Sequence, residues 1–213
     1  MFAMSRTRTL LASLVLVAPF AQAHMLWLER PSDSLTQAYF GEFVDDVRET
    51  QAGPLKRFEG LKALQAGKTL DSQAKDSSFD FATSGSADVR LSKALVHKDT
   101  RVIFDAKAGR HETKADDSLT LELVPEAADS NTLTLMFQGK PLAKTEVTAV
   151  SPQKWSKSFR TDEQGKITLE TPWPGIYVLE VAHTVEAKGE QEGKTYEKTR
   201  YVHTLSLLVP EKG

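Results

Sequence analysis

Short runs of apolar and β-branched residues, separated by turn signals, recur along most of this sequence. These runs cover residues 36–44, 89–96, 101–105, 118–124, 132–138, 145–150, 166–170, 176–185 and 196–209. Short strands at regular intervals are typical of β-sandwiches. A small, polar stretch at 125–129 divides the series. We therefore predict a mostly β fold with two β-sandwich units of immunoglobulin-like or transthyretin-like type, residues 24–127 and 128–213.

One helix and one long loop interrupt the predicted strands. Pro54 suits the first position of a helix, apolar residues follow at helical spacing as far as Leu64, and Gly67 suits the end. We expect this short helix to pack on a sheet. Residues 71–88 are polar and rich in Ser and Gly, which predicts a surface loop with a short strand at 79–81.

The first 23 residues have the pattern of a secretory signal peptide. Arg6 and Arg8 precede an almost wholly apolar run at 10–18, and Ala21-Gln22-Ala23 is a small-x-small cleavage site. The run is too short to span a membrane. We expect cleavage after Ala23, a periplasmic location and no integral membrane segment in the mature chain.

Composition excludes several classes of function. Lys and Arg total 27 against 29 Asp and Glu, and this balance disfavours nucleic-acid binding. Cysteine is absent, so disulfides, thiolate metal sites and cysteine nucleophiles are excluded. The sequence also lacks a Gly-x-Ser-x-Gly elbow, a phosphate-binding loop and a His-Glu-x-x-His motif. These absences favour a protein that is not an enzyme.

Two histidines lie on the apolar faces of the last two predicted strands. His183 continues the face of Tyr177, and His203 shares the face of Leu205, because side chains alternate along a strand. An antiparallel pairing places the two rings directly opposite if the turn centres near Gly193, and diagonally on one face if it centres one residue earlier. Two such imidazoles can share a metal ion, or can be core residues with hydrogen-bond partners.

Cleavage after Ala23 would make His24 the first residue of the mature chain. A terminal histidine offers both its α-amine and its ring to one ion, and nitrogen ligands suit nickel, cobalt and copper. The apolar residues 25–28 predict a buried strand that holds His24 rigidly. We therefore predict His24, His183 and His203 as ligands of a divalent transition-metal cofactor.

Other residues are weaker candidates for this site. His97 ends a predicted strand and suits a turn, and His111 lies in a polar loop. Met25 is a possible soft ligand but suits the core better. Glu29 and Glu180 are candidates for orienting an imidazole, although surface ion pairs are the commoner role of such residues.

The opening stretch resembles a known family. Residues 23–29 (AHMLWLE) are similar to the start of exported bacterial proteins of the NikM-like group, which is filed with periplasmic components of cobalt and nickel uptake systems. Residues 137–143, 161–166 and 172–181 also match, and the first two of these stretches resemble transthyretin-like and Cna-B-like modules. The resemblance covers 24–29 and 133–209. It implies an exported, β-rich protein of metal acquisition, with the three histidines as candidate ligands.

We expect a periplasmic, non-enzymatic protein that captures nickel or cobalt, with copper and iron as alternatives. It would deliver the ion to an inner-membrane transporter or an outer-membrane receptor. Two other functions stay open. A copper-dependent oxidative enzyme could use the same terminal histidine, but no substrate platform is recognisable, since Trp173 lies between two prolines in a predicted loop. A sandwich module for adhesion or assembly would bind no metal.

Overall fold

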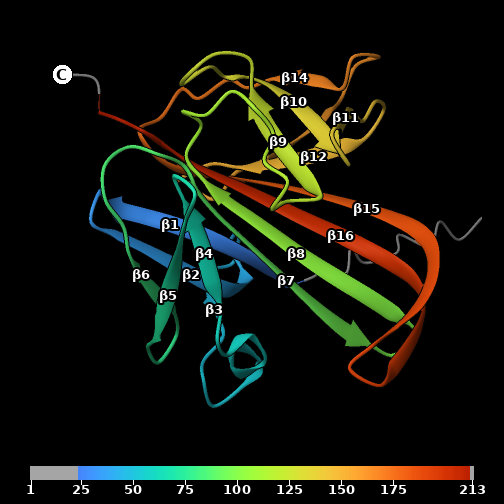
Figure 1. Cartoon of the computed structure of the whole chain (residues 1–213). Coiled ribbons are helices and arrows are strands. Elements are labelled where there is room, and N and C mark those ends of the chain that lie inside the picture. The colour runs from blue at the N-terminus through green and yellow to red at the C-terminus, as the bar shows by residue number, and fades with distance from the viewer. Residues whose placement is uncertain (1–23, 212–213) are drawn as a thin grey trace, which may run out of the picture.

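The computed structural model describes residues 24–211, and these residues form an almost entirely β structure (Figure 1). The predicted mostly β, sandwich-type fold is confirmed, whereas the predicted signal peptide at 1–23 lies outside the described residues. No helix within 24–211 has the length and apolar character needed to cross a bilayer. The strands are β1 Met25–Ser32, β2 Leu35–Glu42, β3 Val47–Arg48, β4 Lys62–Gln65, β5 Lys68–Ala74, β6 Phe79–Ala82, β7 Val89–His97, β8 Thr100–Ala108, β9 Leu121–Pro125, β10 Thr132–Phe137, β11 Lys140–Pro141, β12 Glu146–Val150, β13 Ser156–Arg160, β14 Lys166–Thr168, β15 Gly175–Gln191 and β16 Lys194–Val209.

The predicted helix is wrong in type and length. Only a short 3₁₀ helix, η1 (Pro54–Phe58), forms there, and its Leu55 and Phe58 side chains are buried. From Lys62 the chain is strand β4, which turns into β5 through Ala66 and Gly67. Both turn residues have positive φ, 48° and 74°, as two-residue hairpin turns require. Gly67 therefore makes a hairpin turn rather than a helix end. Strand β5 also occupies the start of the predicted loop, while the short strand expected at 79–81 is confirmed as β6.

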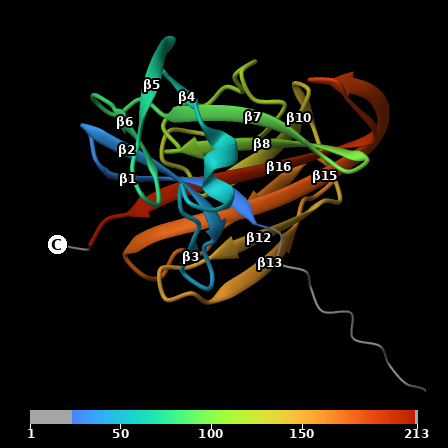
Figure 2. The same ribbon diagram turned by 90° about the horizontal axis from the view of Figure 1, so that it is seen from below.

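The larger sheet has twelve strands and runs across the predicted boundary between residues 127 and 128. Its order is β1-β2-β6-β5-β4-β7-β8-β16-β15-β12-β13, with β3 paired to β2 (Figure 2). Strand β16 pairs in parallel with β8 and antiparallel with β15, so it joins the two halves of the chain. The four-stranded sheet also crosses the boundary, because β9 pairs with β10. The division into units 24–127 and 128–213 stays a prediction.

The last hairpin keeps its apolar faces in register by means of a β-bulge. Glu192 and Gly193 form its two-residue turn, with φ of 53° and 73°. Uniform pairing from that turn would place His183 and His203 on opposite faces. Between Glu186 and Gly189 the register shifts by one residue, so that His183 faces Tyr201 and Val181 faces His203. The two histidines therefore lie diagonally on one face, as the second of the two predicted registers requires.

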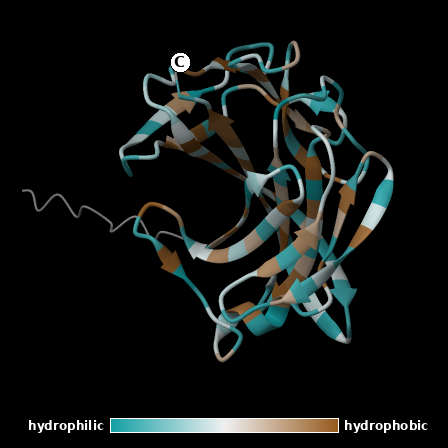
Figure 3. Cartoon of the chain, turned by 90° about the vertical axis from the view of Figure 1, so that its left-hand side faces the viewer, coloured by the Kyte–Doolittle hydropathy of each residue, from teal (hydrophilic) through white to brown (hydrophobic). Residues whose placement is uncertain are grey.

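Strand β16 is buried on both faces, since its side chains enter two different cores. Val202 packs in a core with Leu26 of β1, while Leu205 packs in another with Leu123 of β9. Figure 3 shows that the hydrophobic residues lie mainly on the strands, whereas many of the turns are hydrophilic. A third cluster, around Trp27, fixes β1 against β12 and β15.

Gly41 lets the short strand β3 pack closely against β2. Its φ is +148°, and a Cβ placed on it would lie 2.1 Å from the Val47 carbonyl oxygen. We expect Gly41→Ala to lower the free energy of unfolding by about 1–3 kcal/mol, measured by urea denaturation. Gly60→Ala is the control, because Gly60 has a φ of +73° but open space around it, and it reports backbone strain alone. Equal losses in the two variants would contradict the proposed collision.

Candidate functional site

His24 lies directly before β1, with its ring between two carboxylates. Its Nε2 is 2.6 Å from Glu49 Oε1, and its Nδ1 is 3.5 Å from Glu42 Oε1. Glu42 ends β2 and Glu49 follows β3, so the β2–β3 hairpin brings both acids to the start of β1. The backbone N–H of Glu49 donates to the Phe40 carbonyl at 2.8 Å, and the His24 ring packs against Phe40 at 5.4 Å between centroids. The His24 side chain remains 37% exposed.

The two sides of the His24 ring suit different roles. Glu49 is at hydrogen-bond distance from Nε2, and a carboxylate in that position fixes the orientation of a metal-ligating imidazole. Glu42 and Nδ1 are farther apart than a hydrogen bond. Two ligands that each lie about 2.1 Å from a tetrahedral ion are separated by about 3.4 Å. The pair Nδ1–Glu42 therefore has the spacing of two ligands, with Glu49 as the orienting group.

His203 offers no ring lone pair to a metal, because Nε2 accepts a hydrogen bond and Nδ1 of the neutral ring then carries the proton. It is fully buried, and its Nε2 accepts a hydrogen bond from the Leu123 backbone N–H at 3.1 Å. Burial, with a smaller effect of the Lys107 charge, lowers the pKa of His203 from 6.5 to about 3. The ring is therefore neutral at physiological pH and holds β9 on the sheet.

His183 is half-buried and packs edge-on against Phe137, with 4.7 Å between ring centroids. His183 thus fits the second of the two predicted roles, that of a core residue on the apolar face of its strand. The other histidines lie apart from this face. His97 is exposed at the end of β7, and His111 is exposed in a loop where its Nδ1 is 3.8 Å from Asp129.

His24 and His203 lie on opposite sides of strand β16. Side chains alternate along β16, so Val202 and Thr204 point to one side and His203 to the other. The Thr204 hydroxyl donates to the Leu26 carbonyl at 2.8 Å, which places β1 on the side away from His203. The structure therefore does not bring the three predicted ligands together. Within residues 24–211, no three His, Asp or Glu side chains form a ready-made metal site.

Glu29 does not have the orienting role considered for it, and Glu180 is a half-buried acid. Glu29 accepts a hydrogen bond from Trp27 Nε1 at 3.0 Å and pairs with Arg48 at 2.8 Å. Burial raises the pKa of Glu180, and the Arg200 charge opposes this rise. The two acids at His24 are instead Glu42 and Glu49, which no spacing in the sequence connects to His24.

A buried cluster of charged side chains lies where β7, β8 and β9 meet. Lys107 Nζ is 3.0 Å from Glu122 and 3.3 Å from Asp88, and Arg90 Nε donates to Glu122 at 2.9 Å. None of these four side chains is more than 3% exposed. Removal of one partner would leave a buried charge uncompensated, which is strongly destabilising. The cluster therefore has a structural role: it ties β9 to the large sheet.

Asp105 is a buried acid next to this cluster. It accepts hydrogen bonds from the backbone N–H groups of Thr120 and Leu121 at 3.2 and 3.1 Å. Burial nevertheless raises its pKa from 3.8 to about 6. The sequence contains one signal of this polar layer, since Asp105 and Lys107 interrupt the apolar run 102–108 at alternate positions.

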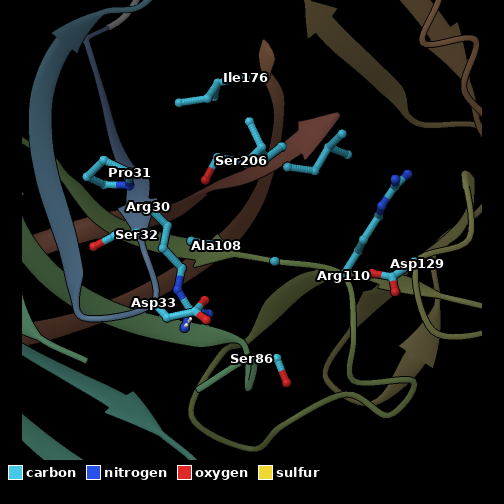
Figure 4. A pocket seen from close by; sticks show the side chains of 13 residues that line it. Arg30, Pro31, Ser32, Asp33, Ser86, Ala108, Arg110, Asp129, Ile176 and Ser206 are labelled. Atoms are coloured by element: carbon cyan, nitrogen blue, oxygen red, sulfur yellow. Dashed lines mark ion pairs between the residues drawn. The ribbon is translucent and has the colours of Figure 1, made fainter. Parts of the chain in front are cut away.

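A cleft of about 310 Å³ opens between the β1–β2 turn and the chain that follows β8 (Figure 4). Arg30 is 3.7 Å from Asp33, and its guanidinium donates to the Ala87 carbonyl at 2.8 Å. Arg110 has Asp129 beside it in the same cleft. The charges are therefore balanced, and the cleft does not favour an anionic ligand.

Two exposed tryptophans meet on the surface, which the sequence did not predict. Trp155 and Trp173 have ring centroids 6.3 Å apart and are 56% and 39% exposed. Each lies in a connection between strands, and the pairing of β12 with β15 brings those connections together. Trp173 lies in a loop, as predicted, and Trp155 is the aromatic neighbour that the sequence did not indicate.

Comparison with known proteins identifies a family match but no function. The family model described as "Domain of unknown function (DUF4198)" matches residues 88–185. No curated protein matches the chain. A solved structure, the two fibronectin type-III domain segment from chicken tenascin, is 12% identical over 84% of this chain and 97% of its own length, with a TM-score of 0.25. The matched residues 88–185 include His183, but neither His24 nor His203.

The burial of His203 predicts a stability loss in acid. The folded protein keeps this ring neutral down to about pH 3, whereas the unfolded chain takes up the proton below about pH 6.5. Between these values the unfolded state binds more protons, so stability falls as the pH falls, by up to about 1.4 kcal/mol per pH unit. His203→Gln retains an acceptor for the Leu123 N–H and should lack this dependence.

Urea unfolding of the parent chain and of His203→Gln, between about pH 3 and 6.5, measures this difference in the free energy of unfolding. Asp105 has the opposite pH dependence, because its raised pKa favours the folded state in acid, and it is present in both proteins. The exposed His111→Gln variant is the control and should follow the parent chain. Parallel stability curves for His203→Gln and the parent would contradict the proposed neutral, buried ring.

Proposed function

We propose that the mature protein captures one divalent transition-metal ion at His24 and passes it to a membrane transporter. The observation that supports this proposal is the position of the His24 ring between Glu42 and Glu49, 3.5 and 2.6 Å away. The α-amine, once cleavage after Ala23 exposes it, and Nδ1 would chelate the ion, and Glu42 would complete a set of three donors. Glu49 would hold the ring in place. His183 and His203 have no part in this site.

The donor set indicates which ions are suitable. Two nitrogens and one carboxylate suit nickel, cobalt, copper or zinc better than calcium or magnesium, which prefer oxygen ligands. The resemblance to the NikM-like group supports nickel or cobalt as the cargo. Both nitrogens must lose their protons to bind, so affinity should weaken in acid.

Exposure of the site supports transfer rather than storage. The His24 side chain is 37% exposed, so a partner can approach the ion while it is still bound. Three protein donors leave a coordination position open for a ligand of the partner. The protein would then act by ligand exchange, with no chemical step of its own.

Calorimetric titration of the mature protein with nickel, cobalt and copper tests the proposal. One glycine added before His24 removes the amine from the chelate, and Glu42→Gln removes the carboxylate. We expect each change to lower affinity by at least about tenfold. Glu49→Gln should cost about 10–100-fold, as the loss of orienting groups does at other metal sites.

His97→Ala and His183→Ala are the matched controls, and both should bind as the parent does. A loss of affinity in His183→Ala would place the site at the hairpin instead. Unchanged affinity after the added glycine would exclude the amine as a ligand. No uptake of any of the three metals would leave the sandwich module as the remaining function.

A further inference from the structure

An aromatic notch lies where the β12–β13 turn meets the loop before β15. Trp155, Phe159, Trp173 and Tyr177 line it, and its volume is about 160 Å³. We propose that this notch binds one ring of a neutral oligosaccharide. The proposal is independent of metal binding at His24 and rests on different residues.

The exposure of the two tryptophans points to a ligand. Only four large hydrophobic side chains among residues 24–211 are exposed, and Trp155 and Trp173 are two of them. They lie side by side, with ring planes at 74°. Clustered apolar surface of this kind on a folded protein marks an interaction site more often than isolated exposed residues do.

Hydrogen bonds hold the backbone of both tryptophans in place. The Trp155 backbone N–H donates to Ser151 Oγ at 3.2 Å, and the Ser151 backbone N–H donates to the Trp155 carbonyl at 2.8 Å. The Trp173 backbone N–H donates to the Tyr177 hydroxyl at 3.1 Å. The backbone that carries the two tryptophans is thus fixed before a ligand arrives, which reduces the entropy that binding would lose.

Two charged side chains line the same pocket. Lys157 Nζ is 3.5 Å from Glu170 Oε2, and the two side chains are 43% and 82% exposed. A surface ion pair of this length contributes little to stability, so a ligand can replace it at small cost. The opposite charges cancel, which favours a neutral ligand.

A sugar ring fits this combination better than other ligands do. Its C–H faces pack on aromatic rings, whose faces carry partial negative charge. Its hydroxyl groups both donate and accept, so they can satisfy Glu170 and Lys157 together. A proline-rich segment also packs on aromatic grooves, but proline has no N–H to offer Glu170. The volume of the notch holds a single ring rather than the face of a helix.

Titration of the mature protein with neutral oligosaccharides of glucose, mannose, galactose and N-acetylglucosamine tests the proposal. Calorimetry gives the affinity, and tryptophan fluorescence reports the site, since the third tryptophan, Trp27, is 1% exposed. We expect at least one oligosaccharide to bind, and Trp155→Ala or Trp173→Ala to weaken it by at least about tenfold. Trp155→Phe should retain part of the affinity, because its smaller ring still offers a stacking face.

Leu208→Ala is the matched control, because it removes an exposed apolar side chain that is not among the residues lining the notch. Its affinity should equal that of the parent, as should that of His24→Ala and of the parent in a chelator. These last two comparisons separate this proposal from the metal site. Absence of binding by every sugar at millimolar concentration would overturn the proposal. Sugar binding unaffected in both tryptophan variants, or binding of a proline-rich peptide where no sugar binds, would also overturn it.

Discussion

The insertion of β16 between β8 and β15 is the constraint on which the rest of the structure depends. This strand pairs with both neighbours along most of its length, and its alternate side chains fill two separate cores. Its position makes one sheet of strands from both halves of the chain. The position of β16 also sets the surroundings of its side chains. Thr204 donates a hydrogen bond to β1 on one side, while His203 is buried against β9 on the other. A shift of one residue would exchange these environments, and the bulge in β15 prevents that shift.

Burial gives different roles to histidines that look equivalent in the sequence. His203 supports the backbone of β9 and stays neutral, because its pKa lies far below the physiological range. His24 lies at the edge of the sheet between two acids, where its ring is open to solvent. The proposed metal site therefore depends on the β2–β3 hairpin, which carries Glu42 and Glu49, and not on the long hairpin at the end of the chain. Gly41 is part of the same arrangement, since it permits the close return of β3.

Periodicity in the sequence was enough to predict the strand-rich fold and the shared face of His183 and His203, but it left direct and diagonal pairing open, and the bulge in β15 decides between them. It failed at residues 54–67, where apolar spacing favoured a helix although the hairpin turn at Gly67 required strands on both sides. It also failed for the site, because contacts between distant segments leave no local pattern. Glu49 and Trp155 reach their partners only through the pairing of strands, so their roles became visible only in three dimensions.

The packing of β1 on β16 has a consequence for biogenesis. The Thr204 hydroxyl and the Leu26 carbonyl are 178 residues apart along the chain, so the first core cannot close until nearly all of the polypeptide has been synthesised. Contacts of such long range form slowly. For the exported protein that we propose, this delay is useful, because a chain that has not yet collapsed can still thread through a translocation channel. Because the first core needs the last strand, the chain would stay uncompacted until translocation is nearly complete.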